Sequence, residues 1–189
     1  MKKYIQVLLF TLSLFFACSP NAPELQYENR ALDVAAAVET HRLMPRVRQL
    51  AEAHLADTPV DDTGYEPGHL FPAQHLTRDN AVRLVTDAFA DMGYEPDTVL
   101  CGQGLQAAYN VTAEWPGTDT SAKAVLVAAH LDAFYAGADD NGSAVAALLE
   151  TARAVRGFQF RRSIRFVAFD LEEFGCVGST RYVQAGHAD

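Results

Sequence analysis

Cysteine is scarce in this sequence, with only three among 189 residues, which excludes a small domain built on disulfides. Basic residues are also few, since 15 Lys and Arg stand against 24 Asp and Glu and give a net charge of -9. Proteins that bind nucleic acids need a basic surface, so this balance excludes them as a class. Hydrophobic residues make up 49% and charged residues 21%, which excludes a collagen-like or largely disordered chain. The length suits one domain with a hydrophobic core.

Long apolar runs are missing except near the start of the chain. Lys2 and Lys3 precede residues 5–16, which are apolar apart from three polar positions. This run is too short to cross a bilayer as a stable helix and is typical of an export signal. We therefore interpret residues 1–17 as a signal peptide.

Residues 14–18 (LFFAC) resemble a bacterial lipoprotein box, in which the cysteine is lipidated and becomes the new N-terminus. We expect Cys18 to carry the lipid, residues 18–30 to form a polar tether, and residues 31–189 to fold. The resemblance implies an exported, membrane-anchored lipoprotein at the outer membrane or the periplasmic face. An ordinary signal peptide cut nearby is the alternative. Export places Cys101 and Cys176 in an oxidising compartment, where they either form a disulfide or stay as small buried residues.

The order of the expected helices and strands indicates an α/β fold. Apolar periodicity predicts a helix over residues 31–56, which Pro45 is expected to kink or split, and a second helix over 77–92. Strands are expected at 108–115, 124–129 and 163–169, and helices at 143–155 and 178–184. This alternation predicts a mixed, partly parallel sheet flanked by helices. The strand at 124–129 is continuously apolar, so we expect it to be buried on both faces.

Polar side chains follow two of these strands directly. His130 and Asp132 come after the strand at 124–129, and Glu172 and Glu173 come shortly after the strand at 163–169. Because ligand sites in open α/β sheets lie beyond the carboxyl ends of the strands, we expect these groups to share one edge of the sheet. The acidic loop at 137–143 (GADDNGS) lies between them in sequence.

The chemistry of these groups favours a zinc site. Imidazole and carboxylate ligands suit zinc, and hydrolytic zinc sites keep one position open for water. Glu172 and Glu173 are neighbours whose side chains point in different directions. One of them is therefore free to bind metal while the other handles a proton, as metal-assisted hydrolysis requires.

Residues 130–132, 137–143 and 170–179 resemble, in order and spacing, the co-catalytic zinc aminopeptidase family of bacterial leucyl aminopeptidases and aminopeptidase Y. Residues 109–117 resemble the strand that precedes the family's metal-binding region. The resemblance implies a three-layer αβα zinc-exopeptidase fold, here incomplete at the C-terminus. It also implies two zinc ions as cofactors and peptide or protein N-termini as substrates.

The resemblance also implies a role for each matching residue. His130 would bind one zinc, Glu173 the other, and Asp139 would bridge both. Glu172 would be the general base that deprotonates the metal-bound water and then protonates the leaving amine. Asp132 would orient His130 through its other ring nitrogen. A cis peptide is implied between Asp139 and Asp140.

The family uses two further ligands, an Asp and a His, from segments beyond residue 179. Neither His187 nor Asp189 stands in a matching motif. We therefore interpret residues 31–189 as the N-terminal portion of a peptidase domain and expect the chain to be nearly inactive by itself. Two alternatives stay open: a glutaminyl cyclase, which shares the architecture but uses a single zinc, and a non-catalytic lipoprotein that binds peptides.

Overall fold

A computed structural model describes residues 30–57, 79–101, 109–133 and 135–187 of the chain. The predicted signal peptide and Cys18 lie outside the described residues, as does the tether except for Arg30, which begins the first helix. Among the described residues, no helix is long and apolar enough to cross a membrane.

Within these residues, four strands form one sheet in the spatial order β1-β2-β4-β3. Their bounds are β1 Asp97–Leu100, β2 Tyr109–Trp115, β3 Val125–His130 and β4 Ile164–Phe169. Strands β1 and β2 pair antiparallel, as do β2 and β4, whereas β3 and β4 are parallel. This confirms the predicted mixed, partly parallel sheet.

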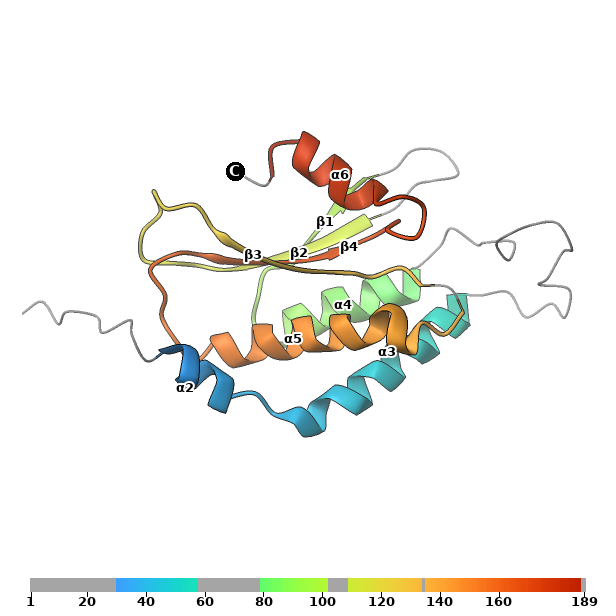
Figure 1. Cartoon of the computed structure of the whole chain (residues 1–189), viewed down its shortest axis with the longest axis horizontal. Helices are drawn as coiled ribbons and strands as arrows, with labels where there is room; N and C mark the ends of the chain where they lie inside the picture. The colour runs from blue at the N-terminus through green and yellow to red at the C-terminus, as the bar shows by residue number, and fades with distance from the viewer. Residues whose placement is uncertain (1–29, 58–78, 102–108, 134, 188–189) are drawn as a thin grey trace, which may run out of the picture.

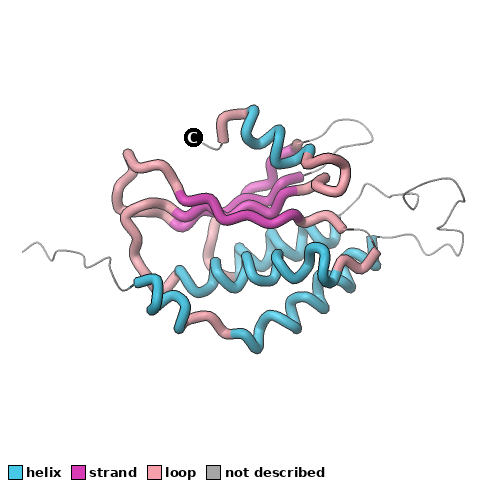
Figure 2. The backbone as a smooth tube through the Cα atoms, in the orientation of Figure 1, coloured by secondary structure: helices cyan, strands magenta, loops and turns pink. Residues whose placement is uncertain are grey.

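Helices cover both faces of this sheet (Figures 1 and 2). Helices α4 (Asp79–Asp91) and α5 (Ala144–Val155) contact the strands on one face, and α3 (Leu43–Asp57) packs onto those two helices. The short helix α2 (Arg30–Ala36) lies on the same side, near one end of α5. Helix α6 (Val177–Gln184) lies across the opposite face, so the helices and the sheet form the predicted three layers.

The core between α4, α5 and the sheet is built around packed aromatic rings. Phe89 of α4 and Phe166 of β4 are fully buried, with ring centroids 6.2 Å apart. The ring of Tyr94 packs edge-on against Phe166 at 5.9 Å and donates its hydroxyl hydrogen to the Ala152 carbonyl at 2.7 Å. This cluster joins one helical layer to the central strand β4, which anchors the segment that follows that strand.

The predicted helix over 31–56 is interrupted earlier than expected. The break falls between α2 and the 3-10 turn η2 (Thr40–Arg42), and Pro45 lies in the first turn of α3. A proline is tolerated there, because the first backbone N–H groups of a helix have no acceptor inside it. Side chains of α5 hold the break in place: Glu150 accepts the Glu39 N–H at 2.6 Å, and Arg153 donates to the carbonyl of Ala37.

Two further differences concern the sheet. Strand β3 is at its edge in the described structure and is only partly covered, with Val125 and Leu126 both more than 40% exposed. The prediction that residues 124–129 are buried on both faces is therefore wrong, because in the described part of the chain β3 is an edge strand with a single neighbour. The short strand β1 was not predicted, since four residues carry too little pattern to reveal a strand.

A test of this core replaces Phe166 with Ala. We expect a loss of about 3–5 kcal/mol in the free energy of unfolding, measured by urea denaturation, because a fully buried ring leaves a cavity. Leu32→Ala on α2 is the matched control, since Leu32 is 74% exposed. The control should change stability by no more than about 0.5 kcal/mol. Similar losses for both variants would contradict the described packing.

Candidate metal centre

Two parallel strands bring the first site residues together. His130 is the last residue of β3 and pairs in register with Phe169, the last residue of β4. The Leu131 N–H donates to the Phe169 carbonyl at 2.5 Å and extends this pairing by one step. The chain after β4 therefore starts beside His130, and it carries Glu172 and Glu173 to the same edge.

The acidic loop adds a carboxylate from a third segment. It forms a tight turn, η4 (Ala138–Ser143), just before α5. Gly137 enters it with a left-handed backbone, φ 53°, and its carbonyl accepts the Gly142 N–H at 2.8 Å. A side chain at Gly137 would collide with the Cβ of Ala133, so glycine is required there. The turn places Oδ1 of Asp140 3.1 Å from Nε2 of His130.

Three residues form the described cluster that suits a metal ion. His130, Asp140 and Glu173 each offer one ligand atom, and these atoms lie within 4.8 Å of one another. Two of the atoms are carboxylate oxygens and one is an imidazole nitrogen, a donor set typical of zinc. The His130 side chain is 15% exposed and that of Asp140 is 76% exposed, so the cluster opens to solvent on the side of the acidic loop.

The tautomer of His130 supports a cation at this point. Its Nδ1 lies 3.1 Å from the backbone carbonyl oxygen of Asp132. A carbonyl only accepts hydrogen bonds, so Nδ1 carries the hydrogen and the neutral ring presents a lone pair at Nε2. That lone pair faces the Asp140 carboxylate, which is unfavourable unless a proton or a metal ion lies between them. The residues present therefore fit a divalent cation.

Asp132 connects the ends of β3 and β4. Its side chain is 2% exposed, and its two oxygens accept the N–H groups of Glu172 at 3.0 Å and Glu173 at 3.1 Å. Its Oδ1 also lies 3.6 Å from Nδ1 of His130. The predicted contact between Asp132 and the far ring nitrogen is present, although the backbone oxygen is the closer partner. The carboxylate additionally fixes the backbone that carries both glutamates.

The two glutamates occupy different positions, as predicted for neighbouring residues. Glu173 belongs to the three-residue cluster, whereas Oε2 of Glu172 lies 3.9 Å from Nε2 of His130. Burial raises the pKa of Glu173, and the charges of Asp140, Asp132 and Glu172 raise it further, while His130 opposes them. A bound cation would relieve this concentration of negative charge.

A buried polar network supports the segment with the glutamates, and sequence reasoning missed it. The Asn110 side chain, 0% exposed, accepts the Asp170 N–H at 2.9 Å and donates to the Gly178 carbonyl at 3.0 Å. Asp170 accepts the N–H groups of Leu171 and Tyr109. The signal was present, because Asn110 and Asp170 are polar residues within or next to apolar strands. Such residues are buried only when their hydrogen bonds are satisfied.

The structure changes one predicted ligand. Asp139 was expected to bridge the metals, but Asp140 lies beside His130, and the cis peptide is Asp140–Asn141 instead of Asp139–Asp140. Asp139 is exposed, and its backbone carbonyl accepts the Ser143 hydroxyl at 2.7 Å. Adjacent side chains point in different directions, so only one aspartate of the pair faces the imidazole.

No disulfide joins Cys101 to Cys176, since Cys101 is buried and Cys176 is exposed. The Cys176 thiol lies 3.5 Å from Oε1 of Glu172, and this hydrogen bond raises the pKa of Cys176.

Comparison with known proteins agrees with this geometry. Residues 110–189, which contain all the site residues, match Peptidase family M28. This part of the chain is therefore similar to that peptidase family. Leupeptin-inactivating enzyme 1 of Streptomyces exfoliatus, a relative of this M28 segment, is 44% identical over 79 residues, which cover 40% of this chain and 18% of that protein. The probable lipoprotein aminopeptidase LpqL of Mycobacterium tuberculosis is 40% identical over 95 residues, which cover 48% of this chain and 19% of LpqL.

Solved structures extend the likeness to the fold of most of the chain. LapB from Legionella pneumophila superposes with a TM-score of 0.65 at 22% identity, over 86% of this chain and 44% of LapB. Tannerella forsythia glutaminyl cyclase superposes with a TM-score of 0.54 at 20% identity, over 75% of this chain and 54% of the cyclase. These likenesses show the fold, and fold alone does not separate peptidase from cyclase. The chain spans well under two thirds of the length of these proteins.

Replacing Asp140 with Asn tests the assignment of the ligand. We expect zinc affinity, measured by competition with a chromogenic chelator, to fall by at least about tenfold, because one of three described ligand atoms loses its charge. Asp139→Asn is the matched control and should bind zinc like the unmodified chain. A loss confined to Asp139→Asn would restore the prediction made from sequence.

Proposed function

We propose that this chain belongs to a zinc-dependent aminopeptidase, which removes residues from the N-termini of peptides. The observation that carries the proposal is the convergence of His130, Asp140 and Glu173 within 4.8 Å, at the ends of two parallel strands. The match of residues 110–189 to Peptidase family M28 supports it. The curated relatives named above include an aminopeptidase, which favours peptide hydrolysis over the glutaminyl cyclase alternative.

In this proposal His130 and Glu173 would hold zinc, and Asp140 would take the metal-binding role that was predicted for Asp139. A bound zinc ion would supply Lewis-acid chemistry, which acidifies water and polarises the carbonyl of the scissile bond. The exposure of Asp140 leaves one side of the cluster open to solvent, from which a peptide N-terminus can approach.

Glu172 is proposed as the general base. Its carboxylate lies 3.9 Å from the imidazole of His130 but outside the three-residue cluster, so it is free to accept a proton from the attacking water. It can then donate that proton to the departing amine. Asp132 is a positioning residue. Its carboxylate accepts the backbone N–H groups of Glu172 and Glu173, so the distance between the base and the ligand stays fixed.

The test of this proposal replaces Glu172 with Gln in the complete gene product. We expect kcat for hydrolysis of leucine 4-nitroanilide to fall by about 10²–10⁴-fold while bound zinc, measured by atomic absorption, is unchanged. Glu95→Gln is the matched control, because Glu95 is exposed and lies outside the site. A complete protein that binds one zinc and cyclises N-terminal glutamine, without releasing free amino acids, would establish the cyclase instead. Zinc binding without either activity would favour a peptide-binding lipoprotein.

We also propose that the protein is exported and held at the membrane by a lipid on Cys18. The charged start, the short apolar run and residues 14–18 support this, and the relative LpqL is named as a probable lipoprotein. A lipid at this point would tether the domain to the outer membrane or the periplasmic face through residues 18–30.

Replacing Cys18 with Ser tests the anchor. We expect the variant to move from the detergent phase to the aqueous phase in Triton X-114 partitioning, because the thiol that takes the lipid is gone. Cys176→Ser is the matched control and should stay in the detergent phase. An aqueous unmodified protein would instead indicate an ordinary signal peptide.

A further inference from the structure

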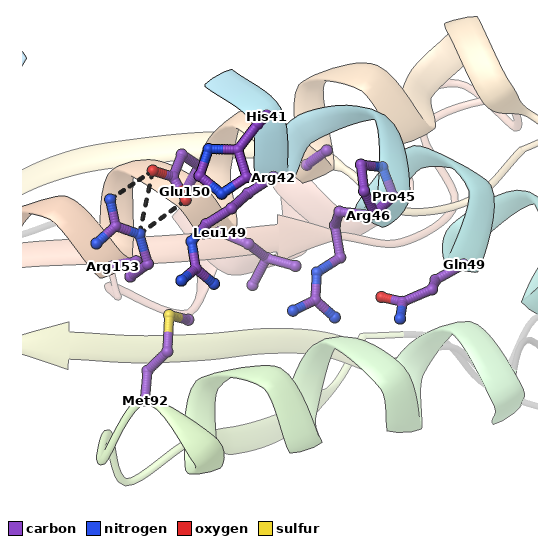
Figure 3. A pocket seen from close by; sticks show the side chains of 10 residues that line it. His41, Arg42, Pro45, Arg46, Gln49, Met92, Leu149, Glu150 and Arg153 are labelled. Atoms are coloured by element: carbon purple, nitrogen blue, oxygen red, sulfur yellow. Dashed lines mark hydrogen bonds and ion pairs between the residues drawn. The ribbon is translucent and has the colours of Figure 1, made fainter. Parts of the chain in front are cut away.

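A hollow lies on the helical side of the molecule, and the charge of its lining is unlike that of the metal centre. It has a volume of about 410 Å³ and is formed by η2, the start of α3, α5 and Met92 (Figure 3). Three arginines line it, Arg42, Arg46 and Arg153, whereas Glu150 is the single acidic residue among the described residues of its lining. This is a local concentration of positive charge in a chain of net charge -9.

Two of these arginines already have carboxylate partners. Arg153 pairs with the buried Glu150 at 2.7 Å and lies 3.5 Å from Glu39. Arg42 forms an ion pair with Glu39. These pairs fix the wall of the hollow, because the same Glu150 also accepts the backbone N–H of Glu39. The wall is therefore preorganised.

Arg46 differs from the other two. It is half-buried, and no acidic side chain of the described residues lies within ion-pair distance of it. In Figure 3 its side chain and that of Arg42 extend from α3 and η2 toward the segment that carries Met92. Burial lowers the pKa of Arg46. The negative charge of Asp91 raises this pKa, and the positive charge of Arg42 lowers it. The guanidinium nevertheless stays charged, so its hydrogen-bond donors remain available.

The rest of the lining defines the kind of ligand. A planar guanidinium matches the two oxygens of a carboxylate or phosphate group. Met92, Leu149 and Pro45 supply apolar surface beside it. We propose that this hollow binds a small oxyanion, a carboxylate or a phosphate, with Arg46 as its main anchor and Arg42 as a second donor. The site is separate from the residues of the metal centre and does not rest on the proposed function.

The negative charge of the whole chain makes this proposal easy to test. A protein of net charge -9 repels anions in general, so a saturable response to them requires a local site. The experiment follows thermal unfolding of the chain during titration with sodium phosphate and, separately, sodium propionate, at ionic strength held constant with chloride. We expect a saturable rise in Tm with at least one of the two anions, and the responding anion identifies the ligand class.

Variants locate the effect. Arg46→Gln should raise the apparent Kd for the anion by about tenfold or more, because it removes the charged hydrogen-bond donor. Arg83→Gln on α4 is the matched control, since Arg83 is an exposed arginine outside the hollow, and it should respond like the unmodified chain. Asp140→Asn should also respond like the unmodified chain, which separates this site from the metal centre. No saturable rise with either anion, or equal responses of Arg46→Gln and Arg83→Gln, would overturn the proposal.

Discussion

The buried carboxylate of Asp132 is the contact on which the metal centre depends. The carboxylate joins the segment after β3 to the segment after β4 by accepting the N–H groups of Glu172 and Glu173. The backbone oxygen of the same residue orients His130. One residue thus orients the ring of one proposed metal ligand and fixes the positions of a second proposed ligand and of the proposed base. Carboxylates that accept backbone N–H groups form strong, charge-assisted hydrogen bonds. The arrangement is therefore fixed before any metal binds.

The fold serves this contact from both sides of the sheet. On the face covered by α4 and α5, the aromatic cluster around Phe166 anchors β4 to α4. On the face covered by α6, Asn110 ties the turn after β4 to the start of α6. A side chain at Gly178 would collide with the Asp170 carbonyl, so glycine allows α6 to begin this close to the strand. Asp140, the third member of the cluster, enters from the turn before α5. The three segments that form the cluster are thus supported by the fold where they meet.

Sequence was sufficient for the parts of this arrangement that follow from strand direction. His130 and the Glu172–Glu173 pair come directly after apolar strands, and parallel strands end at one edge, so their meeting was predictable. The choice between Asp139 and Asp140 was not, because it depends on the backbone dihedrals inside one turn. Nor was the exposure of β3, since an apolar run does not reveal how many strands lie beside it. Asn110 stood out in its strand, but its partners lie about 60 residues away.

The most direct measurement of the central claim is a crystal structure of this chain grown with zinc, with anomalous scattering data at the zinc edge. We expect an anomalous peak within bonding distance of Nε2 of His130 and of carboxylate oxygens of Asp140 and Glu173, with Glu172 outside the coordination sphere. Asp132 should still accept the N–H groups of both glutamates. A zinc peak elsewhere, or a zinc ion bound by Asp139 with Asp140 turned to solvent, would contradict the account.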